Sequence, residues 1–205
     1  MARRFAALIA LLILVVGFIV VPAAIAPEVP LVADEPDPIA SPASTPLPFV
    51  ELPQPTAGAA PVRVEIPALG AVGIVPVGLA EDGQAEIPQD ISTVGWYRFG
   101  STPDVGRGST VLVGHRDSKG GRGALFDLEA VPVGANLAVT DEAGGTTAFL
   151  VVSNASIDKR AVPFDDLYAR TGPPRLVIIS CGGEYVRGSG YQDNQVLVAN
   201  IAGTP

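Results

Sequence analysis

From Pro61 to the C-terminus, short runs of β-forming residues alternate with turn-forming residues. Val, Ile and Thr dominate the runs, and Gly, Pro, Asp and Asn separate them. This pattern favours strands joined by turns. We expect strands at 62–66, 71–77, 110–114, 136–140, 146–157, 176–180 and 195–201, a helical turn at 124–129 and a short helix at 163–170. The region is therefore restricted to an all-β fold, a sandwich or closed barrel of seven or eight strands.

The first 60 residues have a different composition. Residues 5–26 carry no charged side chain, and as a helix they would span about 30 Å, the thickness of the hydrocarbon core of a bilayer. Arg3 and Arg4 precede this segment and acidic residues follow it, which orients the N-terminus toward the cytoplasm. We expect residues 1–4 to be cytoplasmic, residues 5–26 to form a transmembrane signal anchor, and the rest to lie outside the cell. The protein would then be a single-pass protein of the cell membrane.

A cleaved signal peptide is the competing interpretation of this segment. Ala24-Ile25-Ala26 has the small-x-small form of a cleavage site. However, the apolar run is longer than the usual signal-peptide core of about 7 to 15 residues, and Pro27 would directly follow the cut. We therefore favour an uncleaved anchor, and both interpretations export the remainder of the chain.

Residues 27–60 are expected to form a proline-rich extracellular linker. Ten of the chain's 20 prolines lie within residues 27–61, where no helical or alternating pattern occurs. At about 3 Å per residue, polyproline II geometry would let this segment reach on the order of 100 Å. The linker would hold a catalytic or binding domain, residues 61–205, away from the membrane.

Composition limits the ligands of this domain. Residues 61–205 carry 11 basic and 16 acidic side chains, and no stretch concentrates the positive charge. Nucleic acid is therefore not expected as a partner. One cysteine excludes an internal disulfide, and one cysteine with one histidine does not make a zinc set. We expect no metal, no cofactor and a monomer.

The single histidine and the single cysteine each follow a predicted strand. His115 ends the run Ser109-Thr-Val-Leu-Val-Gly-His115, and Cys181 ends Arg175-Leu-Val-Ile-Ile-Ser-Cys181. The thiolate is the nucleophilic form of cysteine, and an ordinary thiol with a pKa near ~8.5 needs a base to reach it at neutral pH. If the fold brings the two together they form a nucleophilic pair. Otherwise Cys181 is a small buried residue and His115 an ordinary loop residue.

Seven short sequence motifs, called words below, resemble those of sortases, the cysteine transpeptidases of bacterial cell surfaces. Their order and spacing, together with the anchored topology, carry the resemblance, which covers about residues 61–201. The last four words resemble the actinobacterial class F group (class E/F) in particular. The words are Val113-Gly-His115, Val177-Ile-Ile-Ser-Cys181, Val196-Leu-Val-Ala199, Gly114-His-Arg-Asp117, Ala124-Leu-Phe126, Cys181-Gly-Gly183 and Tyr191-Gln-Asp-Asn194.

The resemblance implies a closed eight-stranded β-barrel in which His115 and Cys181 face each other across a groove. It implies that Cys181 attacks a backbone carbonyl of a Leu-Pro-x-Thr-Gly-like sorting signal and forms a thioacyl enzyme. His115 would protonate the leaving amine and deprotonate the incoming one. The implied partners are the sorting-signal peptide of a surface protein and an amine acceptor in peptidoglycan or a pilin.

The family also supplies a basic residue, usually arginine, after the cysteine to stabilise the oxyanion. Arg187 is the only arginine downstream of Cys181 and is the first choice. If the closing strands are aligned by residues 196–199 instead, the arginine position falls on Asn194, which can donate a hydrogen bond but carries no charge. Both assignments stay open at this point.

Further residues are candidates for contact with substrate. Ser180 precedes the nucleophile, where the family commonly has threonine. Gly182 and Gly183 would let a peptide backbone approach the sulfur, and Trp96 would lie near the groove. Each also has a structural interpretation: packing beside the strand, a tight turn, and burial in the core. Asp117 could orient the histidine in the manner of a catalytic triad, but because it lies only two residues further along a loop, an ordinary surface aspartate is the favoured interpretation.

Two other functions stay open. An L,D-transpeptidase is also a β-rich cysteine enzyme of the cell wall, but it carries a Ser-His-Gly-Cys type signature, and His115 is far in sequence from Cys181. A membrane-tethered β-domain that binds wall polymers or surface proteins without catalysis is the alternative to an enzyme. A buried, unreactive Cys181 would favour that alternative.

Overall fold

Residues 58–81 and 84–203 are described by the computed structural model. The expected anchor at 5–26 and all but the last residues of the expected linker at 27–60 lie outside the described residues. Within the described part of the chain, no helix has the length and apolar character needed to cross a bilayer.

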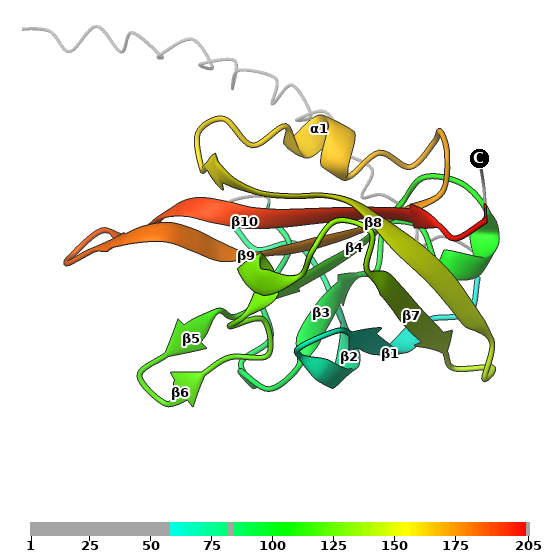
Figure 1. The fold of residues 1–205 in the computed structure, drawn as a ribbon, viewed down its shortest axis with the longest axis horizontal. Coiled ribbons are helices and arrows are strands. Elements are labelled where there is room, and N and C mark those ends of the chain that lie inside the picture. The colour runs from blue at the N-terminus through cyan, green and yellow to red at the C-terminus, as the bar shows by residue number, and fades with distance from the viewer. Residues whose placement is uncertain (1–57, 82–83, 204–205) are drawn as a thin grey trace, which may run out of the picture. The chain divides into compact units, whose positions relative to one another are not determined.

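Eight strands close into a barrel in the order β1-β2-β3-β4-β9-β10-β8-β7 (Figure 1). The β2–β3 and β4–β9 pairs are parallel, and the other pairs around the barrel are antiparallel. The barrel strands are β1 Pro61–Ile66, β2 Gly70–Val77, β3 Val94–Tyr97, β4 Ser109–Gly114, β7 Asn136–Asp141, β8 Thr146–Asp158, β9 Arg175–Val186 and β10 Gly190–Ile201.

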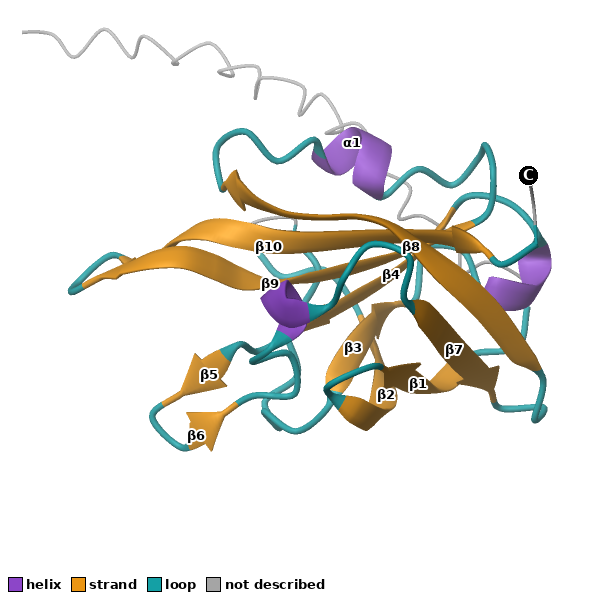
Figure 2. Ribbon diagram, in the orientation of Figure 1, coloured by secondary structure: helices purple, strands orange, loops and turns teal. Residues whose placement is uncertain are grey.

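Outside the barrel, a small hairpin and three short helical segments complete the described fold (Figure 2). The hairpin pairs β5 Asp117–Ser118 with β6 Gly121–Arg122. The helical segments are α1 Phe164–Leu167 and two 3₁₀ turns, η1 Pro103–Val105 and η2 Leu128–Ala130. The predicted all-β barrel of eight strands with few helices is thus confirmed.

One strand is not predicted and two extend well beyond their predicted bounds, while the other five differ from prediction by one residue at one end. β3 was not among the expected strands, because four residues that include Gly95 give too short a pattern. The strand expected to end at Ser180 continues to Val186, and the strand expected to begin at Gln195 begins at Gly190. Glycines in these extensions predict turns from the sequence, but each extension is held by pairing with the other (Figure 1). Cys181 therefore lies within β9 rather than at its end.

The central strands β4 and β9 are buried on both faces. Leu112 and Ile178 point into the barrel interior, while Val113 and Ile179 belong to a second apolar cluster on the outer face. Leu167 of α1 covers this outer cluster, and Figure 1 shows the α1 segment running along the outside of the strands. Burial on both faces explains why these two strands read as continuous apolar runs in the sequence.

Candidate active site

Parallel pairing of β4 with β9 brings His115 and Cys181 together. The register sets Gly114 opposite Ser180, so the next residue of each segment is the histidine on one side and the cysteine on the other. Side chains alternate between the two faces of a strand, so His115 and Cys181 point to the outside of the barrel, as Val113 and Ile179 do. Both are half-buried, and both line one hollow. The fold thus brings together the two residues that the sequence singled out.

Cys181 lies at the boundary of two hollows. The first, of about 540 Å³, is called the polar hollow and also contains His115. The second, of about 50 Å³, is called the apolar hollow and does not contain His115. Besides Cys181, the polar hollow is lined by His115, Arg116, Asp117, Ser118, Lys119, Tyr185 and Tyr191. The apolar hollow is lined by Gln84, Ala85, Ile87, Val113, Gly114, Phe164, Tyr168, Ile179, Ser180 and Asn194.

The imidazole of His115 is held by a backbone carbonyl rather than by a carboxylate. Its Nε2 lies 2.9 Å from the carbonyl oxygen of Pro88, in the loop between β2 and β3. Asp117, the one carboxylate that the sequence analysis considered for orienting the histidine, instead accepts at its Oδ2 a hydrogen bond of 2.6 Å from the hydroxyl of Tyr191. Pro88 is a residue of the site that the sequence did not reveal, since a backbone carbonyl leaves no side-chain signal.

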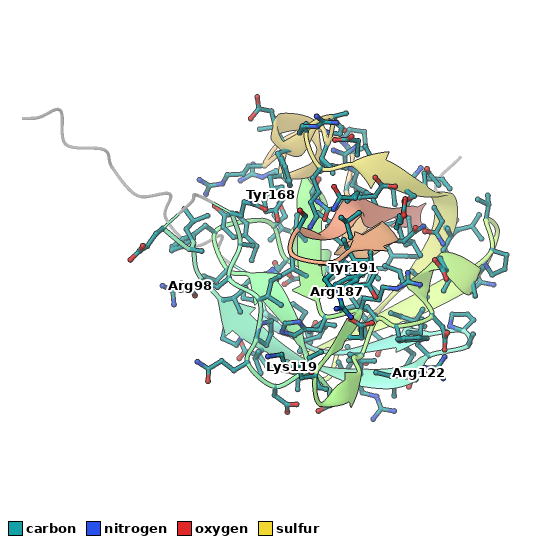
Figure 3. All side chains as sticks on the ribbon, turned by 90° about the vertical axis from the view of Figure 1, so that its left-hand side faces the viewer. Arg98, Lys119, Arg122, Tyr168, Arg187 and Tyr191 are labelled. Carbon is teal, nitrogen blue, oxygen red and sulfur yellow. The ribbon has the colours of Figure 1, made fainter. Side chains whose placement is uncertain are left out.

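Of the two candidates for oxyanion stabilisation, Asn194 is the nearer to the sulfur. It is the register partner of Cys181, and directly paired antiparallel residues have Cβ atoms about 5 Å apart on the same face. Arg187 lies in the turn between β9 and β10 (Figure 3). It is exposed, and its guanidinium has no hydrogen bond or ion pair with any residue of 58–81 or 84–203.

Ser180 and Trp96 have different surroundings. Ser180 is buried, and by the alternation along β9 its side chain points into the barrel, away from the row that holds Ile179 and Cys181; its hydroxyl has no hydrogen-bond partner among the described residues. Trp96 lies in the barrel interior, where its indole Nε1 donates to the carbonyl of Ser101 at 3.2 Å. It lines neither hollow beside Cys181. Ser180 therefore borders the site through its position next to Cys181 while its side chain is buried, and Trp96 lies in the core.

Gly182 and Gly183 are required by the β9–β10 hairpin itself. A Cβ atom at Gly182 would lie 2.8 Å from the backbone nitrogen of Gln195. Gly183 has a φ of +71°, and a Cβ atom there would lie 2.4 Å from Oδ2 of Asp193. The backbone of the paired strand excludes a side chain at Gly182, and the positive φ disfavours one at Gly183, which accounts for both glycines without a substrate.

One wall of the polar hollow is a network that the sequence analysis did not identify. Arg116 donates two hydrogen bonds to Glu129, at 2.9 and 3.1 Å, and its guanidinium lies over the rings of Phe126 and Tyr191. The Glu129 hydrogen bond raises the pKa of Arg116 and lowers that of Glu129. The rings of Tyr185 and Tyr191 meet edge to face at 5.2 Å between centroids.

This network ties the β9–β10 hairpin to the loop that follows the histidine. Tyr191 is the link, because it contacts Arg116 and donates to Asp117, 74 residues earlier in the chain. The hydrogen bond to Asp117 raises the pKa of Tyr191. Both partners lie in words that carry the resemblance, but no spacing in the sequence indicates that they meet. Among the residues with described positions, no group of three or more His, Cys, Asp or Glu side chains gathers as a metal site.

Comparison with known proteins identifies the family. Residues 64–202 match the family described as the sortase domain. Among curated protein sequences, none matches this chain. Several solved structures share the fold. Sortase C1 from Streptococcus suis superposes with a TM-score of 0.54 at 19% identity, over 72% of this chain and 75% of that one.

Two further structures give the same result. The lid mutant of Streptococcus agalactiae sortase C1 has a TM-score of 0.53 at 19% identity, over 74% of this chain and 73% of that one. Sortase C2 of Group B Streptococcus pilus island 1 has a TM-score of 0.51 at 22% identity, over 71% and 74%. At these identities the likeness shows the fold, and the match to the sortase domain over most of the chain shows the family. The chain belongs to the sortase family of cysteine transpeptidases.

Proposed function

We propose that this protein cleaves a sorting signal with Cys181 as nucleophile and His115 as general acid and base, and joins the new carboxyl end to an amine. The position of Cys181 between the two hollows is the observation that carries this proposal. Because His115 lines only the polar hollow, the amine that leaves and the amine that enters belong on that side. The acyl segment then lies on the side of the apolar hollow.

The apolar hollow, of about 50 Å³, has room for part of one side chain from the acyl segment of a Leu-Pro-x-Thr-Gly-like signal. Its lining includes the side chains of Ile87, Val113, Phe164 and Ile179, which favour an aliphatic residue by excluding water from it. Cleavage would follow the threonine of the signal.

The reaction proceeds through two acyl transfers. The thiolate of Cys181 attacks the carbonyl carbon, a C–S bond forms, and the C–N bond to the next residue breaks as His115 gives its proton to the departing amine. An acceptor amine then gives a proton to His115 and attacks the thioester. A new amide bond forms, and the thiolate of Cys181 is released.

Asn194 is the oxyanion-side donor that we favour over Arg187. Its amide can donate a hydrogen bond to the negative oxygen of the tetrahedral intermediate, and its pairing with Cys181 supports a position close to that oxygen. Arg187 would have to reach back from the turn. The site would therefore stabilise the oxyanion with a neutral group.

We further propose that residues 5–26 anchor the protein in the cell membrane and that the catalytic domain acts outside. The uncharged segment and the basic residues before it support this placement. The words Gly114-His-Arg-Asp117 and Tyr191-Gln-Asp-Asn194 support a class F-like sortase. The acceptor would be an amine of the cell wall or of a pilin.

Cleavage of a fluorogenic Leu-Pro-x-Thr-Gly peptide tests the function. Cys181→Ala and His115→Ala should each abolish cleavage, while circular dichroism and thermal unfolding show an intact barrel. Undiminished cleavage by folded Cys181→Ala protein would exclude the proposed mechanism. An inert wild-type protein whose Cys181 resists a thiol reagent would favour the non-catalytic binding domain.

A further inference from the structure

We propose that Pro88 is a positioning residue of this site, whose backbone carbonyl fixes the tautomer of His115 and leaves Nδ1 to exchange a proton with Cys181. The inference rests on the proposed function, because it assigns Pro88 a part in the chemistry of that pair. It starts from the 2.9 Å contact between Nε2 of His115 and the carbonyl oxygen of Pro88.

The chemistry of the contact determines which nitrogen carries the hydrogen. A carbonyl oxygen only accepts hydrogen bonds, so Nε2 of His115 must be the donor. A neutral imidazole has one N–H, and Nδ1 therefore keeps its lone pair. This nitrogen has no hydrogen-bond partner among the described residues, and it belongs to a ring that shares the polar hollow with Cys181. It is the basic nitrogen available to the thiol.

The same carbonyl serves the protonated state. When Nδ1 takes a proton, both ring nitrogens of His115 become donors, and Nε2–H continues to donate to Pro88. A carboxylate performs this task in serine-type triads, where it orients the imidazole and stabilises the imidazolium. Here Asp117 is bound to Tyr191, and a neutral carbonyl takes the place of the carboxylate.

The loop that carries Pro88 is fixed at both ends. On one side, the backbone nitrogen of Glu86 donates to the carbonyl of Gly78 at 3.1 Å, and Oε2 of Glu86 accepts from the nitrogen of Gly78 at 2.9 Å. On the other side, the carbonyl of Ile91 accepts from Ala124 at 2.6 Å. Pro88 itself is buried. The carbonyl is therefore held in place before substrate arrives, as a positioning group requires.

A backbone carbonyl is tested by changing the amide that contains it. The N–H of Gln89 belongs to the same peptide group as the Pro88 carbonyl, and it donates no hydrogen bond within the described residues. An ester at this bond removes only that unused N–H and makes the carbonyl a weaker acceptor. The matched pair is the full-length Gln89→Ala variant and its ester analogue, in which lactic acid replaces that alanine.

Nitrogen NMR of the imidazole reads the tautomer directly, and the chain has one histidine, so the signal needs no assignment. We expect the Nε2–H form to dominate neutral His115 in the Gln89→Ala variant, above its share in the urea-unfolded chain. The ester should lower the ratio of the two tautomers by roughly threefold to tenfold, the effect of one hydrogen bond. The kcat for peptide cleavage should fall with little change in KM.

Either of two results would overturn the inference: a dominant Nδ1–H form in the Gln89→Ala variant, or a tautomer ratio that the ester leaves unchanged. The NMR measurement needs no turnover. A protein that shows the Nε2–H tautomer but never cleaves peptide contradicts the proposed function alone, and an active protein with an unchanged ratio contradicts this inference alone.

Discussion

Asn194 lies directly opposite Cys181 in the β9–β10 pairing, whereas Arg187 lies beyond the end of β9 in the turn. The polar side chain nearest the sulfur on the paired strand is thus a neutral amide. A neutral donor can stabilise an oxyanion by hydrogen bonding, and this is the role that we propose for Asn194 in place of Arg187.

The first prediction compares these two residues. Asn194→Ala should lower kcat for sorting-peptide cleavage on the order of 100-fold, the usual effect of removing one oxyanion donor. Arg187→Ala, the matched control from the same hairpin, should stay within about threefold, because the side chain is exposed and unpaired in the described structure. Steady-state kinetics of the two variants give the answer, and the reverse order would restore Arg187 as the oxyanion residue.

The second prediction concerns the bond between Tyr191 and Asp117. Tyr191→Phe removes a 2.6 Å hydrogen bond that ties the hairpin to the loop after His115, and should lower the free energy of unfolding by about 1 to 2 kcal/mol. A double-mutant cycle with Asp117→Ala, which removes the acceptor, should give a coupling energy of about 1 kcal/mol when measured by urea unfolding. Additive effects of the two changes would show that the contact contributes nothing in solution.

The third prediction concerns alkaline stability. Burial raises the pKa of Tyr168 from 10.0 to about 12, so the folded protein holds this proton more tightly than the unfolded chain. Stability from this group is complete below pH 10 and is lost as the pH rises toward about 12. Tyr168→Phe should flatten the fall of unfolding free energy across this window. Tyr185→Phe, a control with an exposed ring, should not, and equal slopes in all three proteins would contradict the assignment.

The fourth prediction separates two glycines of the same hairpin. Both have a positive φ, but a Cβ atom at Gly188 meets nothing within 4 Å, while one at Gly183 meets Asp193. Gly188→Ala should cost roughly 1 to 2 kcal/mol from backbone strain. Gly183→Ala should cost about 1 kcal/mol more, because Asp193 must move and lose its 2.8 Å hydrogen bond from Ser156. If thermal unfolding shows that both variants lose the same stability, Asp193 moves away from an added Cβ atom at Gly183 without a cost.

The sequence predicts the barrel well because strands such as β4 and β9 are buried on both faces. Such strands consist of consecutive apolar residues, which are easily recognised in the sequence. It predicts that His115 and Cys181 follow such runs, but not that β4 pairs in parallel with β9. The choice between Arg187 and Asn194 depends on the register of the hairpin, and glycines hide the extended strands that set it.

Other parts of the site have no sequence signal. Pro88 acts through its backbone, so the residue type reveals nothing about the carbonyl. Tyr191 and Asp117 meet only because the hairpin folds over the loop after the histidine. Trp96 shows the reverse error, in which a sequence signal suggests a role that the fold does not support. A large aromatic residue in the catalytic domain suggests a contact with substrate, yet the indole of Trp96 is buried in the core, where it donates a hydrogen bond to the carbonyl of Ser101.

Mass spectrometry of the full chain incubated with a small library of sorting peptides tests the central claim most directly. We expect a covalent adduct on Cys181 with the mass of the acyl segment ending at threonine, and we expect it to disappear when an amine acceptor is added. Cys181→Ala should form no adduct, and His115→Ala should form it far more slowly. Peptide cleavage without any adduct, or cleavage that persists in Cys181→Ala, would contradict the account.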